Sequence, residues 1–328
     1  MALYQPSQLW SGRNDGPDAD VARWHQVINL LDLNKSILRN RDIQVALLGF
    51  SSDEGVRRNK GREGAKNGPS AIRKACSNFA VHFNQLELYD AGDIICNDNN
   101  LEEAQIMLGE KVNQLIQHNF FPIVLGGGHE VAFANFLGVK EKLSKKDSFG
   151  VINFDAHFDL RFPDESVGAT SGTGFWQMAK YIRNAQNEFH YLAVGIQQCS
   201  NTKRLYEIAD ELGVIYIHAD EFTNDQLEHM LNVINSIISN SNIMQLSIDM
   251  DVFAAAHAPG VSAPSFNGIA PNSMLKRLLR HIIFSGKIAS VDIAEVNPAY
   301  DIDNRTARLA ASIIFDIVQA VDRNLEWE

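Results

Sequence analysis

The sequence has little of several features that mark particular classes of protein. Its three cysteines, Cys76, Cys96 and Cys199, are odd in number and far apart, which is typical of free thiols and not of a disulfide framework. No apolar run approaches the roughly 18 to 20 residues that cross a bilayer. The opening segment lacks the basic end and apolar middle of a signal peptide. We therefore expect a cytoplasmic protein without a membrane partner.

The chain also lacks an excess of positive charge. It carries 29 Lys and Arg against 40 Asp and Glu, a net charge of −11, whereas dedicated nucleic-acid binders usually carry a basic surplus. We therefore expect no nucleic-acid partner. No repeat, low-complexity tract or proline-rich linker marks a boundary, so we predict a single domain over residues 1–328, with residues 1–40 as an N-terminal extension packed on it.

What the sequence does contain is a recurring pair of patterns, a short apolar, β-branched run followed by a longer stretch of helical period. The runs predict strands at Ile43–Gly49, Phe120–Leu125, Phe149–Phe154, Tyr191–Gly195, Val214–His218, Ile243–Ile248 and Lys287–Ile293. The stretches predict helices at Pro69–Cys76, Glu102–His118, Val131–Leu143, Phe175–Asn184, Lys203–Leu212, Asp220–Ile238, Ser273–Ile283 and Arg305–Asp322. This alternation indicates an α/β fold with a mostly parallel sheet covered on both faces, in which ligands bind beyond the carboxyl ends of the strands.

Acids and histidines follow three of these strands at that edge. The candidates are His129, Asp155, His157, Asp159, Asp249 and Asp251. A single Asp after a strand is usually a helix N-cap, but six ligand-type residues in three loops have no comparable explanation. Residues two apart in an extended chain point the same way, so each loop can direct its ligands into one pocket. The oxygen-rich set exceeds what one tetrahedral zinc needs and favours Mn²⁺ or a related ion in a two-metal site.

A fourth predicted strand, Lys287–Ile293, leads to Glu295 at the same rim. We hypothesise that its carboxylate pairs with a planar amidine or guanidine group of a substrate. A structural carboxylate that caps the next turn is an equal alternative. Gly126–Gly128 lacks the spacing of phosphate-binding loops, so these glycines predict a close approach of backbone to the site.

These segments resemble the ureohydrolase (arginase) superfamily, which is built around Gly-Gly-x-His, Asp-Ala-His-x-Asp and Ser-x-Asp-x-Asp. They occur here in that order as Gly127–His129, Asp155–Asp159 and Ser247–Asp251, and the likeness runs from about residue 43 to the C-terminus. Within the superfamily, further segments look like the formimidoylglutamase family. These are Gly55–Arg62, Asp159–Arg161, Ser171–Thr173, Val252–Phe253 and Ala258–Ser262.

The resemblance implies a three-layer α/β/α fold, two Mn²⁺ per subunit, a homo-oligomer, and hydrolysis of N-formimidoyl-L-glutamate to L-glutamate and formamide in histidine degradation. It implies that one ion is held by His129, Asp155, Asp159 and Asp249, and the other by Asp155, His157, Asp249 and Asp251. A water between the ions would attack the amidine carbon, with Asp159 as a proton acceptor.

The end of the substrate remote from the metals decides among related substrates. Arg161 stands where arginases carry an Asn that meets the substrate carboxylate, and a guanidinium there favours an acidic substrate. Residues 195–201 hold no acid where arginases have an Asp that grips an ammonium group. The basic residues are Arg57, Arg58, Lys60 and Arg62. They form either a solvated loop or the source of one cation for a second carboxylate, and Lys60 is our candidate substrate contact among them. The resemblance adds three polar substrate contacts, Ser171, Thr173 and Asn201.

Three departures from the superfamily pattern affect this interpretation. No His lies between Gly168 and Gly174, so the general acid is unassigned, Ala254 replaces a common Asp, and Gly174 stands where Pro is expected. The alternatives are an agmatinase or guanidino-acid hydrolase, a non-catalytic metal-binding protein and, less favoured, a deacetylase-like enzyme with one zinc.

Overall fold

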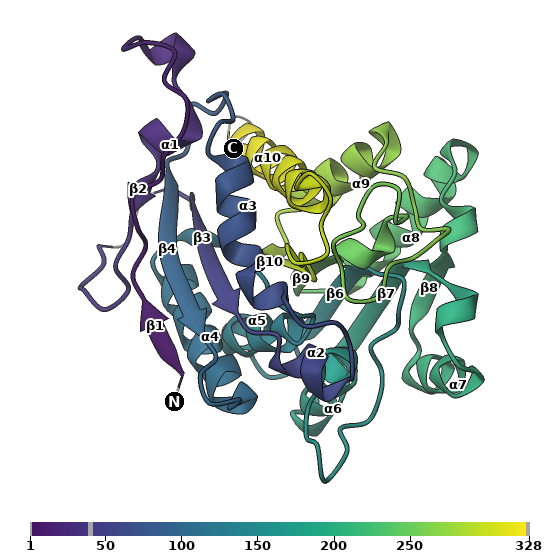
Figure 1. Ribbon diagram of the computed structural model, residues 1–328. Coiled ribbons are helices and arrows are strands. Elements are labelled where there is room, and N and C mark those ends of the chain that lie inside the picture. Colours follow the sequence, from purple (N-terminus) through teal and green to yellow (C-terminus); the bar gives the residue numbers. More distant parts are fainter. Residues whose placement is uncertain (1, 39–41, 326–328) are drawn as a thin grey trace.

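The fold is that of a computed structural model, which describes residues 2–38 and 42–325. Its strands form one sheet in the order β1-β4-β3-β5-β10-β9-β6-β7-β8, with β2 paired to β4 (Figure 1). All the pairs are parallel except β1 with β4. The strands are β1 (Leu3–Gln5), β2 (Asn29–Leu30), β3 (Gln44–Ser51), β4 (Leu88–Ile95), β5 (Phe120–Leu125), β6 (Ser148–Phe154), β7 (Glu188–Ile196), β8 (Ile215–His218), β9 (Ile243–Asp249) and β10 (Ile288–Ala294).

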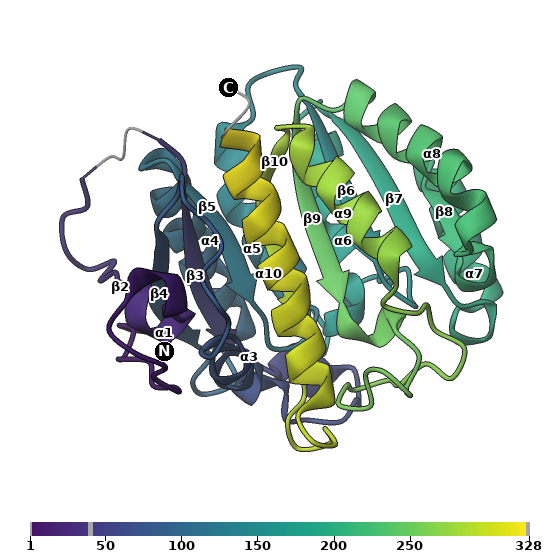
Figure 2. The ribbon, with the colours of Figure 1, turned by 90° about the horizontal axis from the view of Figure 1, so that it is seen from above.

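Helices cover both faces of the sheet, which confirms the three-layer α/β/α prediction (Figure 2). One apolar core joins the sheet to α3, α8, α9 and α10, and a second joins its other face to α4, α5, α6 and α7. The helices are α1 (Trp24–Val27), α2 (Glu54–Arg58), α3 (Gly68–Cys76), α4 (Leu101–Gln117), α5 (Val131–Val139), α6 (Gly174–Asn184), α7 (Lys203–Leu212), α8 (Leu227–Asn240), α9 (Ser273–Phe284) and α10 (Arg305–Leu325). None of these described helices has the length and apolar character needed to cross a membrane.

Strand β4 was missed by the apolar pattern because two acids interrupt it. Asp90 and Asp93 lie within this strand, and both accept hydrogen bonds from the guanidinium of Arg73 on α3, at 3.0 and 2.7 Å. Asp90 also accepts a 2.7 Å hydrogen bond from the indole of Trp10. The acids are therefore paired structural groups, and a buried pair of this kind carries no periodic signal in the sequence.

Other boundaries also differ from the predictions. The helix predicted at Asp220–Ile238 begins only at Leu227, because its first third forms two short 3₁₀ turns, Ala219–Glu221 and Asn224–Gln226. The helix predicted at Val131–Leu143 ends at Val139 and continues as a 3₁₀ turn. Such tightening is common at helix ends.

The expected N-terminal extension, residues 1–40, is described apart from Met1 and residues 39 and 40. Its strand β1 adds to the edge of the sheet with Leu3 opposite Ile95. Trp24 is fully buried and stacks on Phe315 of α10, with ring centroids 5.9 Å apart. These contacts support our proposal that the extension and the sheet form one domain.

The strand order explains how distant segments meet. β5, β10, β9 and β6 are neighbours in the sheet, and candidate site residues lie at the carboxyl end of each strand or in the loop after it. Since β10 lies between β5 and β9, Glu295 emerges between the loop that carries His129 and the end of the strand that carries Asp249. The parallel arrangement therefore gathers all these side chains at one edge.

Candidate metal centre and substrate pocket

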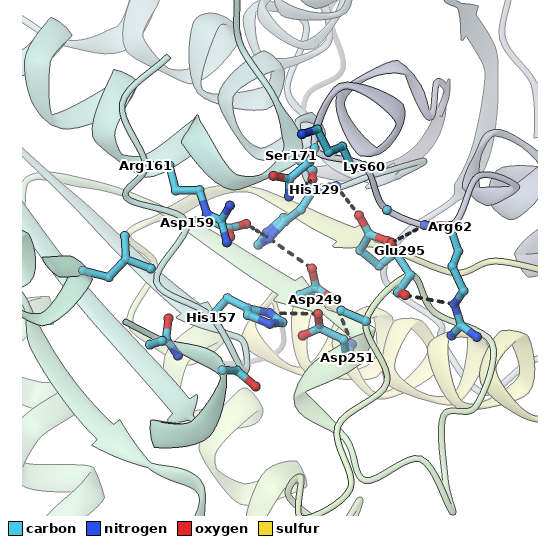
Figure 3. Close-up of a pocket in the computed structure, with 17 residues that line it drawn as sticks. Lys60, Arg62, His129, His157, Asp159, Arg161, Ser171, Asp249, Asp251 and Glu295 are labelled. Atoms are coloured by element: carbon cyan, nitrogen blue, oxygen red, sulfur yellow. Dashed lines mark hydrogen bonds and ion pairs between the residues drawn. The ribbon is translucent and has the colours of Figure 1, made fainter. Parts of the chain in front are cut away.

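The imidazole of His129 faces the carboxylates of Asp155, Asp159 and Asp249, and Figure 3 shows the last two. Its Nδ1 lies 3.1 Å from Oδ2 of Asp155, 2.9 Å from Oδ2 of Asp159 and 3.1 Å from Oδ2 of Asp249. This nitrogen is buried and has no hydrogen-bond partner among the residues that the structure describes. Buried polar atoms are rarely left unpaired, so a ring nitrogen surrounded by carboxylate oxygens fits a bound cation.

A second group of ligand atoms overlaps the first. Nδ1 of His157 lies 3.0 Å from Oδ2 of Asp251 and 3.5 Å from Oδ1 of Asp155. Asp155, His157 and Asp251 place one ligand atom each within 4.8 Å of one another, as do His129, Asp155 and Asp159. The two groups share Asp155, whose two oxygens face different imidazoles. The geometry therefore fits two cations side by side better than it fits one.

Backbone hydrogen bonds fix the carboxylates at the strand ends. Oδ1 of Asp155 accepts the N–H of His157 at 2.7 Å, and Oδ1 of Asp249 accepts the N–H of Asp251 at 2.8 Å. Asn153 donates to the other oxygen of Asp155 at 3.0 Å. An Asp that accepts the N–H two residues ahead ends the extended chain in a turn, which is why these motifs have residues spaced by two.

In the absence of a cation, the side chains of the cluster shift one another's pKa values. Burial alone would lower the pKa of His129, but the carboxylates of Asp249, Asp155 and Asp159 raise it well above its usual value. The pKa of His157 is likewise raised, against burial, by Asp251 and Asp155. Burial and the neighbouring Asp249 also raise the pKa of Asp251. The metal-free centre therefore retains protons that a divalent cation would replace.

The glycine loop before His129 allows a close approach of backbone, as predicted. A Cβ on Gly127 would lie 1.6 Å from the carbonyl oxygen of Ser52, at the end of β3. Behind the loop, the buried carboxylate of Glu130 accepts hydrogen bonds from the Ser52 hydroxyl at 2.9 Å and the Gly55 N–H at 3.0 Å. Burial raises the pKa of Glu130 to about 7. The role of Glu130 is not visible in the sequence, because its partners Ser52 and Gly55 are far away in the chain.

Glu295 lies at the rim of the centre, on a strained backbone. Its φ of 66° is in the left-handed region, which non-glycine residues rarely adopt. Oε1 accepts the N–H of His129 at 3.0 Å, whereas Oε2 is buried and has no partner within the described part of the chain. Burial, followed by the charges of Asp249 and Glu130, raises the pKa of Glu295 well above its usual value. The free oxygen points to a missing hydrogen-bond donor or cation at this position.

A cavity of about 320 Å³ opens over these side chains. Lys60 and Arg161 line it and are exposed, and neither makes an ion pair within residues 2–38 and 42–325. The other basic residues of the same loop are engaged elsewhere. Arg57 and Arg58 both pair with Glu54, and Arg62 donates to the Ser262 carbonyl at 3.0 Å while its guanidinium lies over the Tyr300 ring. Two of the predicted cations are therefore available to a ligand.

The three polar side chains expected to bind substrate have different surroundings. Ser171 lines the cavity and accepts a 3.1 Å hydrogen bond from Asn59. Asn201 also lines it, but its amide is occupied, because it accepts the Phe158 N–H and donates to two backbone carbonyls. The structure does not bring Thr173 to the cavity; its hydroxyl lies 2.8 Å from Oε1 of Gln177.

Asn59, Arg62, Ser200 and Ser262 also line the cavity, although the sequence analysis assigned them no site role beyond the basic cluster. Asn59, Arg62 and Ser262 lie in segments that the resemblance had already marked. Ser200 has no distinctive spacing, so only the folded chain identifies it.

Comparison with known proteins places this geometry in a family. The model of the Arginase family matches residues 43–319. The formimidoylglutamase of Aeromonas salmonicida is 41% identical over 312 residues, covering 95% of this chain and 97% of the relative. Two crystal structures are also similar. That of Trypanosoma cruzi formiminoglutamase with Mn²⁺ has a TM-score of 0.74 and 26% identity, covering 88% of this chain and 96% of the other. That of formimidoylglutamase from Bacillus subtilis has a TM-score of 0.80 and 22% identity, covering 96% of both chains, and shows the fold alone. The chain belongs to the arginase family.

Proposed function

We propose that this protein hydrolyses N-formimidoyl-L-glutamate to L-glutamate and formamide at a centre that binds two Mn²⁺ ions. The observation that carries the proposal is the pairing of two overlapping His and carboxylate groups with a cavity that holds two unpaired cations, Lys60 and Arg161. Support comes from formimidoylglutamase relatives at about 40% identity over nearly the whole chain and from a structural neighbour that was crystallised with Mn²⁺.

The residues present fit a pair of divalent cations. His129, Asp155, Asp159 and Asp249 would hold one, and Asp155, His157, Asp249 and Asp251 the other. The orphaned Nδ1 of His129 and the carboxylate oxygens around it are the donors that Mn²⁺ takes. When bound, such cations supply the positive charge that makes water a nucleophile near neutral pH.

The remaining chemistry is assigned to side chains at the centre. The unpartnered Oε2 of Glu295 would accept an N–H of the amidine and hold its carbon in place. Asp159, whose pKa is raised by burial and by Asp155, would take the proton of the attacking water. Attack forms a new C–O bond, and the bond from this carbon to the glutamate nitrogen then breaks. That nitrogen gains one proton, which balances the proton lost by the attacking water, and leaves as the amine of L-glutamate, while the carbon leaves as formamide.

The other end of the substrate carries two carboxylates and no ammonium group. Arg161 would bind one of them through its planar guanidinium, and Lys60 the other. Ser171, at the wall of the cavity, would donate its hydroxyl to the same end. The bonds made by Asn201 and Thr173 favour roles in holding the loops that carry Phe158 and Thr170. An agmatinase substrate has no carboxylate and would leave both cations without a partner.

Two further expectations belong to this proposal. We propose a cytoplasmic location, which agrees with the three free cysteines of the described chain. We also propose that the subunits form a homo-oligomer, as the resemblance implies. Light scattering of the purified protein tests the assembly, and a single 36.5 kDa species would contradict it.

Identification of the products tests the reaction. Proton NMR of a reaction with N-formimidoyl-L-glutamate should show L-glutamate and formamide appearing in equal amounts, and neither in a chelated control. Release of ammonia with N-formyl-L-glutamate would mean that the other C–N bond of the amidine is cleaved. That result would contradict the proposal while leaving the metal centre in place.

A further inference from the structure

The ring of His129 is held from behind by a chain of buried polar groups. Its Nε2 lies 2.9 Å from the hydroxyl oxygen of Ser247, and that hydroxyl lies 2.5 Å from Oδ1 of Asp292. Ser247 on β9 and Asp292 on β10 are fully buried, and His129 is 2% exposed. Phe175 packs against the ring edge to face, with centroids 5.4 Å apart. The imidazole therefore has a single supported orientation.

The far end of this chain is also fixed. Oδ2 of Asp292 accepts the side-chain N–H of Asn135 at 2.9 Å and that of Gln245 at 2.8 Å. Both amides are fully buried. With Ser247, the carboxylate accepts three hydrogen bonds, which is the pattern of an ionised acid that only accepts.

The direction of these hydrogen bonds decides which ring nitrogen carries the proton. A serine hydroxyl has one hydrogen, and Ser247 gives it to Asp292 because an ionised carboxylate cannot donate. The oxygen of Ser247 must then accept a hydrogen from Nε2 of His129. Nδ1, which faces the oxygens of Asp155, Asp159 and Asp249, is then the nitrogen that gives up its proton when a cation binds. The chain therefore selects the tautomer that can bind a cation through Nδ1.

The second imidazole of the centre has no such support. The side chain of His157 is 25% exposed, against 1% for that of His129. Within the described residues, Nε2 of His157 makes no hydrogen bond comparable to that between His129 and Ser247. The two halves of the centre thus differ in how firmly their histidines are held.

We propose that Ser247 and Asp292 are positioning residues that fix His129 as an Nδ1 ligand and thereby set the affinity of the cation on the His129 side, but not that of the cation on the His157 side. The inference rests on the two-ion centre of the proposed function. It concerns binding of the ion and is independent of the substrate.

The test is a calorimetric titration of the metal-free, full-length protein with Mn²⁺, with free Mn²⁺ followed by electron paramagnetic resonance. In Ser247→Ala and in Asp292→Asn, we expect one of the two equivalents to bind about 10- to 100-fold more weakly, since that is the usual cost of losing a group behind a metal-bound histidine. The other equivalent should bind as in the wild type. Ser247→Thr keeps the hydroxyl and should bind that equivalent more tightly than Ser247→Ala.

Ser241→Ala is the matched control. Ser241 is a buried serine just before β9 whose hydroxyl donates to the Ile237 carbonyl at 2.8 Å, and we place it outside the centre. It should lose a comparable amount of thermal stability and leave both equivalents unchanged. Wild-type affinity in both Ser247→Ala and Asp292→Asn would overturn the inference, as would equal weakening of the two equivalents. A wild-type protein that binds one ion would instead contradict the two-ion centre itself.

Discussion

Glu295 accepts a hydrogen bond from the backbone N–H of His129 at 3.0 Å, although the two residues are 166 positions apart. The contact ties the carboxylate proposed to hold the amidine to the loop that carries a proposed metal ligand. The second oxygen of Glu295 is buried and has no partner in residues 2–38 and 42–325, and its backbone has a φ of 66°. Such strain at a residue with a free polar atom is typical of a functional position.

Replacement of this carboxylate should damage turnover more than metal binding. In Glu295→Gln, the side chain keeps its shape but loses the charge that would pair with the amidinium, and we expect kcat/KM to fall by about 10²- to 10³-fold. Steady-state rates together with the Mn²⁺ content measure the two effects. Glu188→Gln, an exposed acid on β7, is the control. A rate within twofold of the wild type would refute the role assigned to Glu295.

Asp155 is the carboxylate shared by the two ligand groups. Asp155→Asn should therefore lower the affinity for both ions, and by more than the roughly 10- to 100-fold loss caused by altering a group behind a ligand. Asp159 belongs to only one of the two groups, so Asp159→Asn should weaken the binding of one ion. Elemental analysis after dialysis measures the stoichiometry, and Asp316→Asn on α10 serves as the control. Equal losses in the two ligand variants would contradict the sharing.

Arg161 should determine affinity for an acidic substrate. Removal of its guanidinium in Arg161→Ala should raise KM for N-formimidoyl-L-glutamate by about 10-fold or more, since a charge-assisted hydrogen bond contributes about 1.5 to 3 kcal/mol. Arg161→Lys should recover part of this loss. Metal content should not change. Arg204→Ala removes an exposed arginine that pairs with Glu207 and should have no effect on KM. An unchanged KM in Arg161→Ala would contradict this assignment.

Metal binding should stabilise the fold, and more so at higher pH. The pKa values of His129 and His157 are raised in the metal-free protein. Protonation of these residues therefore stabilises the metal-free fold at low pH, and this stabilisation is lost as the pH rises. Mn²⁺ must displace the same protons, and its affinity should therefore increase with pH. The shift in Tm caused by Mn²⁺ should grow from about pH 6 to about pH 8.5. A shift that shrinks over this range would be inconsistent with proton displacement.

The sequence predicted most of the fold because buried parallel strands leave continuous apolar runs. β5, for example, was predicted with its observed ends, Phe120 and Leu125. β4 was missed because Asp90 and Asp93 pair with Arg73 from another element, which no local pattern reveals. The short 3₁₀ turns before α8 were missed because they have the composition of a first helical turn.

The candidate site, like the fold, was predicted from the sequence only in part. The positions of the His and Asp residues after three predicted strands indicated which six side chains would lie together, because the carboxyl ends of parallel strands lie at one edge of the sheet. The sequence could not show that the side-chain amide of Asn201 forms hydrogen bonds with three backbone groups. Nor could it reveal the contact of Ser247 with Asp292, because serine and aspartate on neighbouring strands carry no signal of pairing.

The most direct test of the account is the initial rate of the Mn²⁺-reconstituted protein on N-formimidoyl-L-glutamate, measured beside arginine, agmatine and guanidinobutyrate with a chelated control. We predict turnover of N-formimidoyl-L-glutamate alone, abolished by the chelator and restored by Mn²⁺. Preference for a guanidino compound would contradict the assignment of Lys60 and Arg161 to the two carboxylates. Absence of turnover on all four compounds would contradict the proposal that the protein is a hydrolase of amidine or guanidine compounds.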